Sequence, residues 1–126
     1  MANLLSDRVL DLGLNVLDTE ASHIHLCSQD PTTYTEASST YSLGNKNFGA
    51  GAAFGSPAAA SPNGRKVTST AITDGSVTAT GSAAKWAAVD ATNTRLLANG
   101  SLAASQTVTS GNTFSLASFD IRIPNQ

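Results

Sequence analysis

Charged side chains are scarce in this sequence of 126 residues. Acidic and basic residues make up 13% of the chain and sum to a net charge of −2, whereas a typical globular domain carries about 25% charged residues. A sequence isoelectric point near 5.4 provides no basic surface for a nucleic acid. The single cysteine, Cys27, excludes a disulfide bond within the chain.

Long hydrophobic runs are also missing. No stretch approaches the roughly 18 consecutive apolar residues that a membrane-spanning helix requires. The first residues are MANLLSDRVLDLGLNVL. A signal peptide begins with a basic segment followed by an uninterrupted apolar one, whereas these residues have no basic segment and Asp7 and Asp11 interrupt the apolar run. We therefore expect neither insertion into a membrane nor export by a signal peptide.

Large apolar side chains are few as well. Leu, Ile, Val and Phe together form only about a fifth of the chain, close to the level of roughly 20% below which disorder is common. The small net charge favours a folded state instead. We expect one domain of modest stability that gains order by assembling with other chains, because each additional buried Leu or Phe contributes about 1.5–3 kcal/mol.

The N-terminal segment has the spacing of a helix. Asn3 is a candidate N-cap, and Gly13 would weaken a longer helix by about 1 kcal/mol relative to Ala. The pattern predicts a short helix over residues 3–12 inside an N-terminal arm, residues 1–22, that lies on its own sheet or on a neighbour. Intervals of four, three and four place one set of apolar side chains on a single helical face: Leu5, Val9, Leu12 and Val16.

Strand and turn signals alternate from residue 23 onward. HIHLC (residues 23–27) alternates as a strand does, and TTYTEASSTYSL (residues 32–43) suits extended, partly exposed structure. Asp-Gly in TDGS (residues 73–76) predicts a hairpin turn, and further turns follow at ATNT and SGN. Residues 23–126 are therefore predicted to form an all-β domain, either an antiparallel β-sandwich or a jelly-roll-like or small barrel fold.

Residues 44–64, GNKNFGAGAAFGSPAAASPNG, are rich in Gly, Ala, Ser and Pro. This composition predicts a long flexible loop. Its two phenylalanines either fold back onto the sandwich or insert into a neighbouring subunit. Acidic residues gather before residue 40 and basic ones after it, which indicates a solvated acidic face or contacts between neighbours. The candidate interface residues are Leu4, Leu5, Val9, Phe48 and Phe54.

Few residues are arranged for chemistry. His23, His25 and Cys27 would share one face of a strand and are types that bind zinc or copper. Alternate residues on a strand lie roughly 7 Å apart, so a polar or interface face is the favoured interpretation. GAGAAFG lacks the strand–turn–helix setting and the lysine of a phosphate loop. Trp86 is expected in the core rather than as a surface anchor. We predict no enzyme, cofactor or metal.

The segment WAAVDATNTRLLANGSLAASQTVTSGNTFSLASFDIRI resembles a group of small virion proteins that are encoded among the structural genes of tailed bacteriophages. The N-terminal LLSDRVLDLGLNVLDTEA also looks like the start of such chains. The resemblance covers most of the sequence except the Gly/Ala-rich loop, and its motifs are turn and core motifs. The residues that carry it are Trp86, Asp90, Leu96, Leu97, Gly100, Leu102, Gly111, Asn112, Thr113 and Phe114.

The resemblance implies a β-sandwich structural protein without catalytic residues. The expected role is a capsid decoration (cement) protein, made in the host cytoplasm and bound to the capsid surface of the virion. Its expected partners are the major capsid protein of the same phage and copies of itself, as a dimer or trimer. The alternative is a tail-fibre or tail-tip component that attaches to the host surface; an enzyme is the third and least favoured class.

Overall fold

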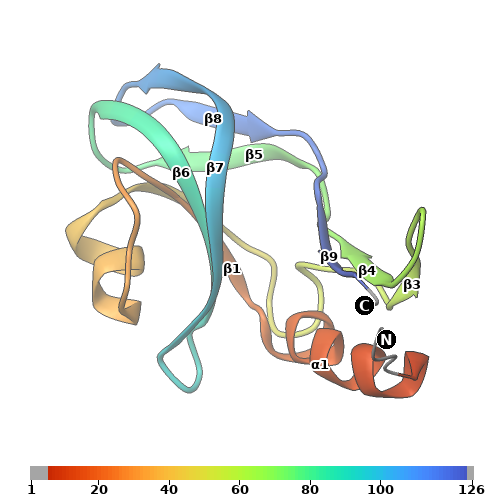
Figure 1. Cartoon of the computed structure of the whole chain (residues 1–126). Coiled ribbons are helices and arrows are strands. Elements are labelled where there is room, and N and C mark those ends of the chain that lie inside the picture. Colours follow the sequence, from red (N-terminus) through yellow and green to blue (C-terminus); the bar gives the residue numbers. More distant parts are fainter. Residues whose placement is uncertain (1–5, 125–126) are drawn as a thin grey trace.

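The computed structural model describes residues 6–124, and most of their regular structure is β (Figure 1). A helix precedes the strands, and a single π-helical turn, Glu36–Thr40, interrupts them. The bounds are α1 Asp7–Glu20, β1 His23–Cys27, β2 Ser42–Asn47, β3 Ala58–Ala59, β4 Arg65–Thr68, β5 Ile72–Val77, β6 Gly81–Asp90, β7 Arg95–Val108, β8 Thr113–Leu116 and β9 Asp120–Ile123.

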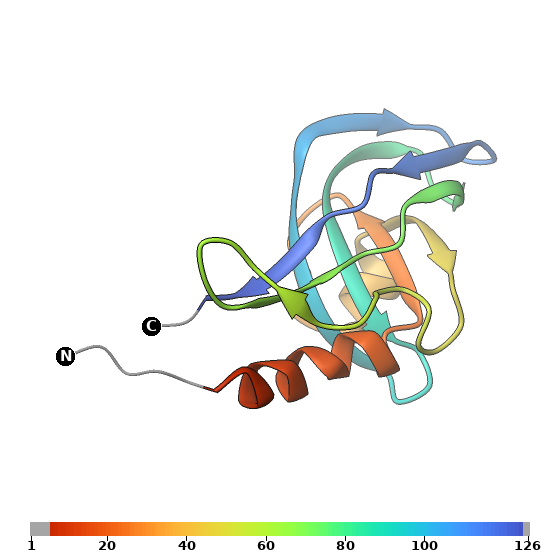
Figure 2. The same cartoon turned by 90° about the vertical axis from the view of Figure 1, so that its right-hand side faces the viewer.

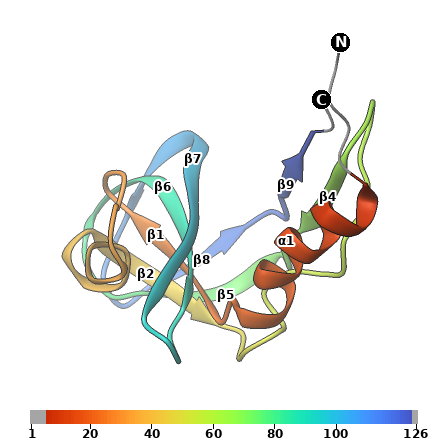
Figure 3. The same cartoon turned by 60° about the horizontal axis from the view of Figure 1, so that its bottom comes forward.

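The described strands form two antiparallel sheets. The larger sheet has the order β7-β6-β1-β2-β5-β8 and the smaller one β3-β4-β9. The larger sheet curls strongly, and α1 lies beside the smaller sheet (Figures 2 and 3). This arrangement confirms the predicted all-β, sandwich-like class with a short N-terminal helix.

Three aromatic rings join the two sheets. Phe119, in the connection from β8 to β9, packs on Trp86 of β6 with ring centroids 4.3 Å apart. Phe54, which forms a bridge with Ser69, meets Phe119 edge to face at 6.0 Å. Trp86 is 9% exposed and Phe54 2% exposed. The predicted core position of Trp86 is therefore confirmed, and Phe54 folds back onto its own chain.

The helix is longer than predicted and begins later. It covers residues 7–20 rather than 3–12, with Ser6 as the N-cap, whose Oγ accepts a hydrogen bond from the Val9 amide at 3.4 Å. Asn3 lies outside the described residues. Gly13 does not end the helix because leucines on both sides of it pack into the core, and their burial outweighs a cost of about 1 kcal/mol. These leucines are Leu10, Leu14 and Leu17.

The predicted loop over residues 44–64 is wrong at its start and in part of its middle, while residues 60–64 are irregular as predicted. Residues 44–47 belong to β2, and Ala58–Ala59 form β3. Ala53 and Phe54 are buried, so the segment between these strands is attached to the core. Phe48 and Phe54 both pack on the core, and these two large side chains hold the glycine- and alanine-rich residues around them in place.

Residues 32–43 are not extended throughout either. The Glu36 carboxylate accepts hydrogen bonds from the Thr32 amide and hydroxyl, both at 2.8 Å, and the Glu36 amide donates to the Thr33 hydroxyl at 3.1 Å. Local bonds of this kind compete with extended structure. They fold the segment into the π-helical turn, which places Ala37 in contact with Cys27 on the outer face of β1.

The Asp-Gly pair at residues 74 and 75 is not a turn. Both residues lie inside β5, and Gly75 pairs with Phe114 of β8. A Cβ atom at Gly75 would overlap the Phe114 ring. Glycine is required here for space under an aromatic ring, whereas the hairpin prediction assumed a positive φ.

The bend and the turn predicted after residue 90 are confirmed. Asp90, at the end of β6, accepts hydrogen bonds from the Thr92 and Asn93 amides at 3.0 and 3.2 Å and from Asn93 Nδ2 at 2.8 Å. Gly111 takes a φ of 92° in the turn between β7 and β8. These hydrogen bonds lower the pKa of Asp90, the largest contribution coming from the Asn93 side chain.

The uneven charge distribution along the chain is largely balanced within it. Acidic residues of the N-terminal third pair with basic residues that follow residue 60: Asp11 with Arg65 at 2.7 Å, Asp30 with Lys85 at 3.6 Å, and Glu20 with Arg95 at 3.6 Å. Contacts between neighbouring subunits are not needed to explain this distribution.

Two glycines give opposite predictions for substitution by alanine. A Cβ at Gly13 would lie 3.7 Å from Ile123 Cδ1, an ordinary contact, whereas a Cβ at Gly100 would lie 2.7 Å from Trp86 Nε1. We expect Gly13→Ala to stabilise the fold by about 1 kcal/mol and Gly100→Ala to destabilise it by about 1–3 kcal/mol. Urea unfolding of both variants measures this. Equal effects of the two changes would contradict the described packing.

Candidate docking surface on the first helix

The outer face of α1 carries an apolar stripe. Val9, Leu12 and Val16 are 54%, 55% and 38% exposed, and among the described residues they are the large hydrophobic side chains that remain exposed. Their spacing of three and four places them on one helical face. We call these three residues the α1 stripe. Contiguous exposed apolar side chains are typical of a binding surface.

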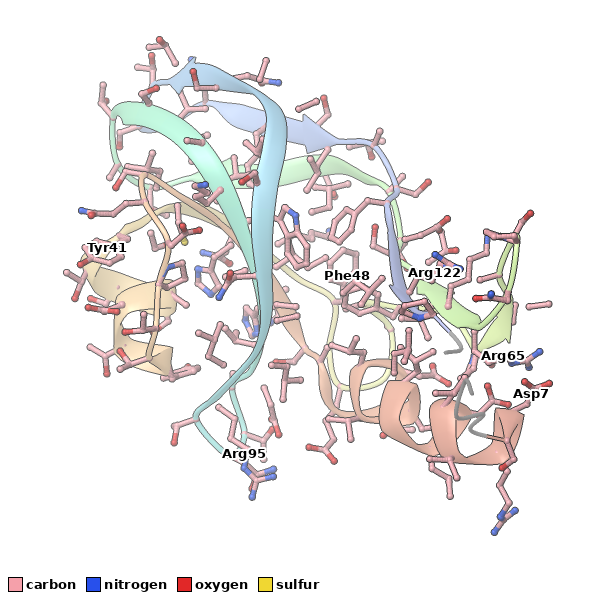
Figure 4. The ribbon with its side chains drawn as sticks, viewed as in Figure 1. Asp7, Tyr41, Phe48, Arg65, Arg95 and Arg122 are labelled. Carbon is pink, nitrogen blue, oxygen red and sulfur yellow. The ribbon has the colours of Figure 1, made fainter. Side chains whose placement is uncertain are left out.

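The helix that carries the α1 stripe is held firmly on the smaller sheet. Its opposite face is buried, and Arg65 of β4 donates two hydrogen bonds to Asp11, from Nε at 2.7 Å and from Nη2 at 3.2 Å. Asp7 lies 4.0 Å from the same guanidinium (Figure 4). These acidic partners raise the pKa of Arg65, with the Asp11 hydrogen bond contributing most. The α1 stripe therefore faces outward from a fixed support.

The predicted interface residues lie in different environments in the structure. Val9 belongs to the α1 stripe, while Phe54 is buried in the core and offers no surface to a partner. Phe48 is half-buried and packs against the same core, pointing inward in Figure 4. Leu4 and Leu5 lie outside the described residues. Sequence reasoning left Leu12 and Val16 off the list of interface residues, although the helical spacing that singled out Val9 includes both.

The strand HIHLC places its polar residues on the outer face of the larger sheet. His25 Nδ1 lies 2.9 Å from Ser42 Oγ, His23 Nδ1 lies 2.9 Å from Ser22 Oγ, and the two imidazole rings stack with centroids 5.9 Å apart. Cys27 Sγ donates to the Ala37 carbonyl at 3.6 Å. Within residues 6–124 no three His, Cys, Asp or Glu side chains are placed to hold a metal ion.

Burial controls the protonation of this row of residues. It raises the pKa of the Cys27 thiol to about 11, so the group stays neutral. Burial, with a smaller contribution from His23, lowers the pKa of His25 to about 4. His25 is 6% exposed and is uncharged at neutral pH. The row is thus a hydrogen-bonded part of the sheet.

The glycine-rich stretch around residue 51 lies at the wrong end of a helix for an anion. A Cβ at Gly51 would be 3.7 Å from the Asp18 carbonyl oxygen and 3.8 Å from that of Thr19, in the last turn of α1. The C-terminal end of a helix dipole repels negative charge, which disfavours phosphate here. In the described part of the chain, neither helical segment is long and apolar enough to cross a membrane.

Comparisons of this chain with protein-family models, with curated proteins and with solved structures found no match.

Stability should fall as the pH falls below neutrality. The unfolded chain binds a proton at His25 near pH 6.5, whereas the folded chain binds it only near pH 4, so the unfolded state gains protons first. We expect a loss of about 2 kcal/mol between pH 7 and pH 5, measured by urea unfolding. His25→Gln should remove most of this dependence, and an unchanged pH profile in that variant would contradict the assignment.

Proposed function

We propose that this protein is a structural component of the virion of a tailed bacteriophage. In this proposal it is a head decoration protein that binds the capsid shell and stabilises it, with the major capsid protein as its principal partner. The observation that carries the proposal is the α1 stripe: apolar side chains that a folded chain normally buries stand outward on an anchored helix.

The energetics of such a contact suit a repetitive shell. Burying one Val or Leu contributes about 1.5–3 kcal/mol, and a stripe of three residues offers a contact of moderate strength. A decoration protein that also contacts copies of itself adds many such contacts over one lattice, so that avidity exceeds the affinity of a single site. A small, weakly charged domain with an outward helix face is adequate for this role.

The placement of the reactive side chains supports a structural role. His25 and Cys27 are held by internal hydrogen bonds on the sheet, and Asp90 closes the turn between β6 and β7. Each of these residues has a structural task that accounts for its position.

Localising the protein in intact particles by electron microscopy separates the head role from the tail alternative. Density that covers the head in many copies supports decoration. A few copies at the tail tip would replace the proposal with a role in host attachment.

A charge on the α1 stripe should weaken shell binding while the fold is retained. Glutamate is a good helix former, so Leu12→Glu keeps α1 intact but would bury an unpaired carboxylate in the contact. We expect at least about a tenfold loss of affinity for heads that lack the protein, measured by cosedimentation. The matched control is Ala104→Glu, an exposed position on β7, a strand of the larger sheet. Equal binding of both variants would disprove the role of the α1 stripe.

A further inference from the structure

The larger sheet is left open between its two edge strands. β7 and β8 follow each other in the chain, joined by a turn in which the Asn112 amide donates to the Thr109 carbonyl at 3.1 Å. Among the described residues β7 pairs with β6 and β8 with β5, but β7 and β8 do not pair with each other. Two edges with free main-chain groups therefore flank one opening, which we call the β7–β8 seam.

Two hollows follow each other along the β7–β8 seam. One has a volume of about 220 Å³ and is mostly apolar, and its lining includes Trp86, Phe119, Leu102 of β7 and Leu116 of β8. The other, nearer the turn, has about 260 Å³ and is mostly polar, between residues 106–109 and 112–115. The first hollow has the size and lining for a large apolar side chain, and the second suits a small or polar one.

The seam carries no charge. Residues 96–119, which include most of β7 and all of β8, contain no Asp, Glu, Lys, Arg or His. Edge strands are usually protected against pairing by charged side chains or proline, and this stretch has neither. The side chains that dock here must themselves be uncharged, because residues 96–119 offer no counter-ion for a desolvated charge.

We propose that the β7–β8 seam accepts residues 1–5 of a second copy of this chain as an added strand. These residues, MANLL, lie outside the described part of the chain, carry no charged side chain and contain two leucines. Five extended residues span about 17 Å, the length of a short strand. Main-chain hydrogen bonds to the free edges hold the segment, and one of the two leucines, Leu4 or Leu5, enters the hollow lined by Trp86, as in strand-addition complexes.

The donor is a second copy because of where the helix begins. The helix α1 begins beside the smaller sheet, at the opposite end of the molecule from the turn between β7 and β8 (Figures 1 and 2). An exchange of such arms closes as a dimer when it is reciprocal, and a non-reciprocal exchange gives a ring when its rotation closes and an open filament when it does not.

The single tryptophan of the chain makes the proposal directly testable. Trp86 lines the apolar hollow, so its fluorescence reports whether the hollow is filled. We expect the purified chain to form dimers or trimers as its concentration rises, followed by sedimentation velocity, with a parallel blue shift of the emission. Replacing both leucines, Leu4→Ser with Leu5→Ser, should weaken association at least about tenfold and remove the shift.

A matched pair of variants tests the acceptor. Ala103 lines the hollow and the neighbouring Ala104 does not, and both are exposed. We expect Ala103→Glu to prevent association and Ala104→Glu to leave it intact. The proposal is overturned if the chain stays monomeric at millimolar concentration, if it associates without a change in Trp86 emission, or if the double serine variant associates normally. These measurements use the chain alone, so their outcome is independent of shell binding.

Discussion

The packing of Trp86 on Phe119 is the contact on which the two-sheet arrangement depends. The chain has one tryptophan and four phenylalanines, and three of these five rings meet where the sheets approach each other. Gly100 makes this possible, because a side chain there would occupy the space of the indole ring. Gly75 and Phe114 repeat the device between β5 and β8. A glycine opposite an aromatic ring thus lets the ring pack closely on the neighbouring strand, which helps a chain with few large apolar side chains to form a core.

Local chemistry made part of this fold predictable. HIHLC has a strand pattern and forms β1 over the same residues, and the bend at Asp90 and the turn at Gly111 have side-chain and φ requirements that the sequence displays. Asp74-Gly75 shows the limit of such signals. The pair looks like a turn, but the ring that covers Gly75 comes from residue 114. No local pattern contains that information.

The orientation of the first helix could not be predicted for a related reason. Both faces of α1 are apolar: leucines at residues 10, 14 and 17 are buried, and the α1 stripe is exposed. Periodicity identifies a helix with two apolar faces but does not determine which one the sheet covers. Arg65 binds Asp11 in the observed orientation, a pairing across 54 residues that becomes visible only in the folded chain. On β1, the strand pattern predicted the polar row of His23, His25 and Cys27, but the sequence did not predict the π-helical turn that packs on Cys27.

The use of charge explains why two surfaces stay available. Ion pairs join elements that are far apart in sequence: α1 to β4, the segment after β1 to β6, and the end of α1 to β7. Most of the charged side chains lie in ion pairs within the chain, whereas the α1 stripe and the β7–β8 seam consist of uncharged residues. An uncharged surface loses little hydration energy when it is covered, so modest apolar contacts suffice for binding. The α1 stripe lies on the helix beside the smaller sheet and the β7–β8 seam lies in the larger sheet, and a molecule with two separate docking surfaces can hold one neighbour while it binds another.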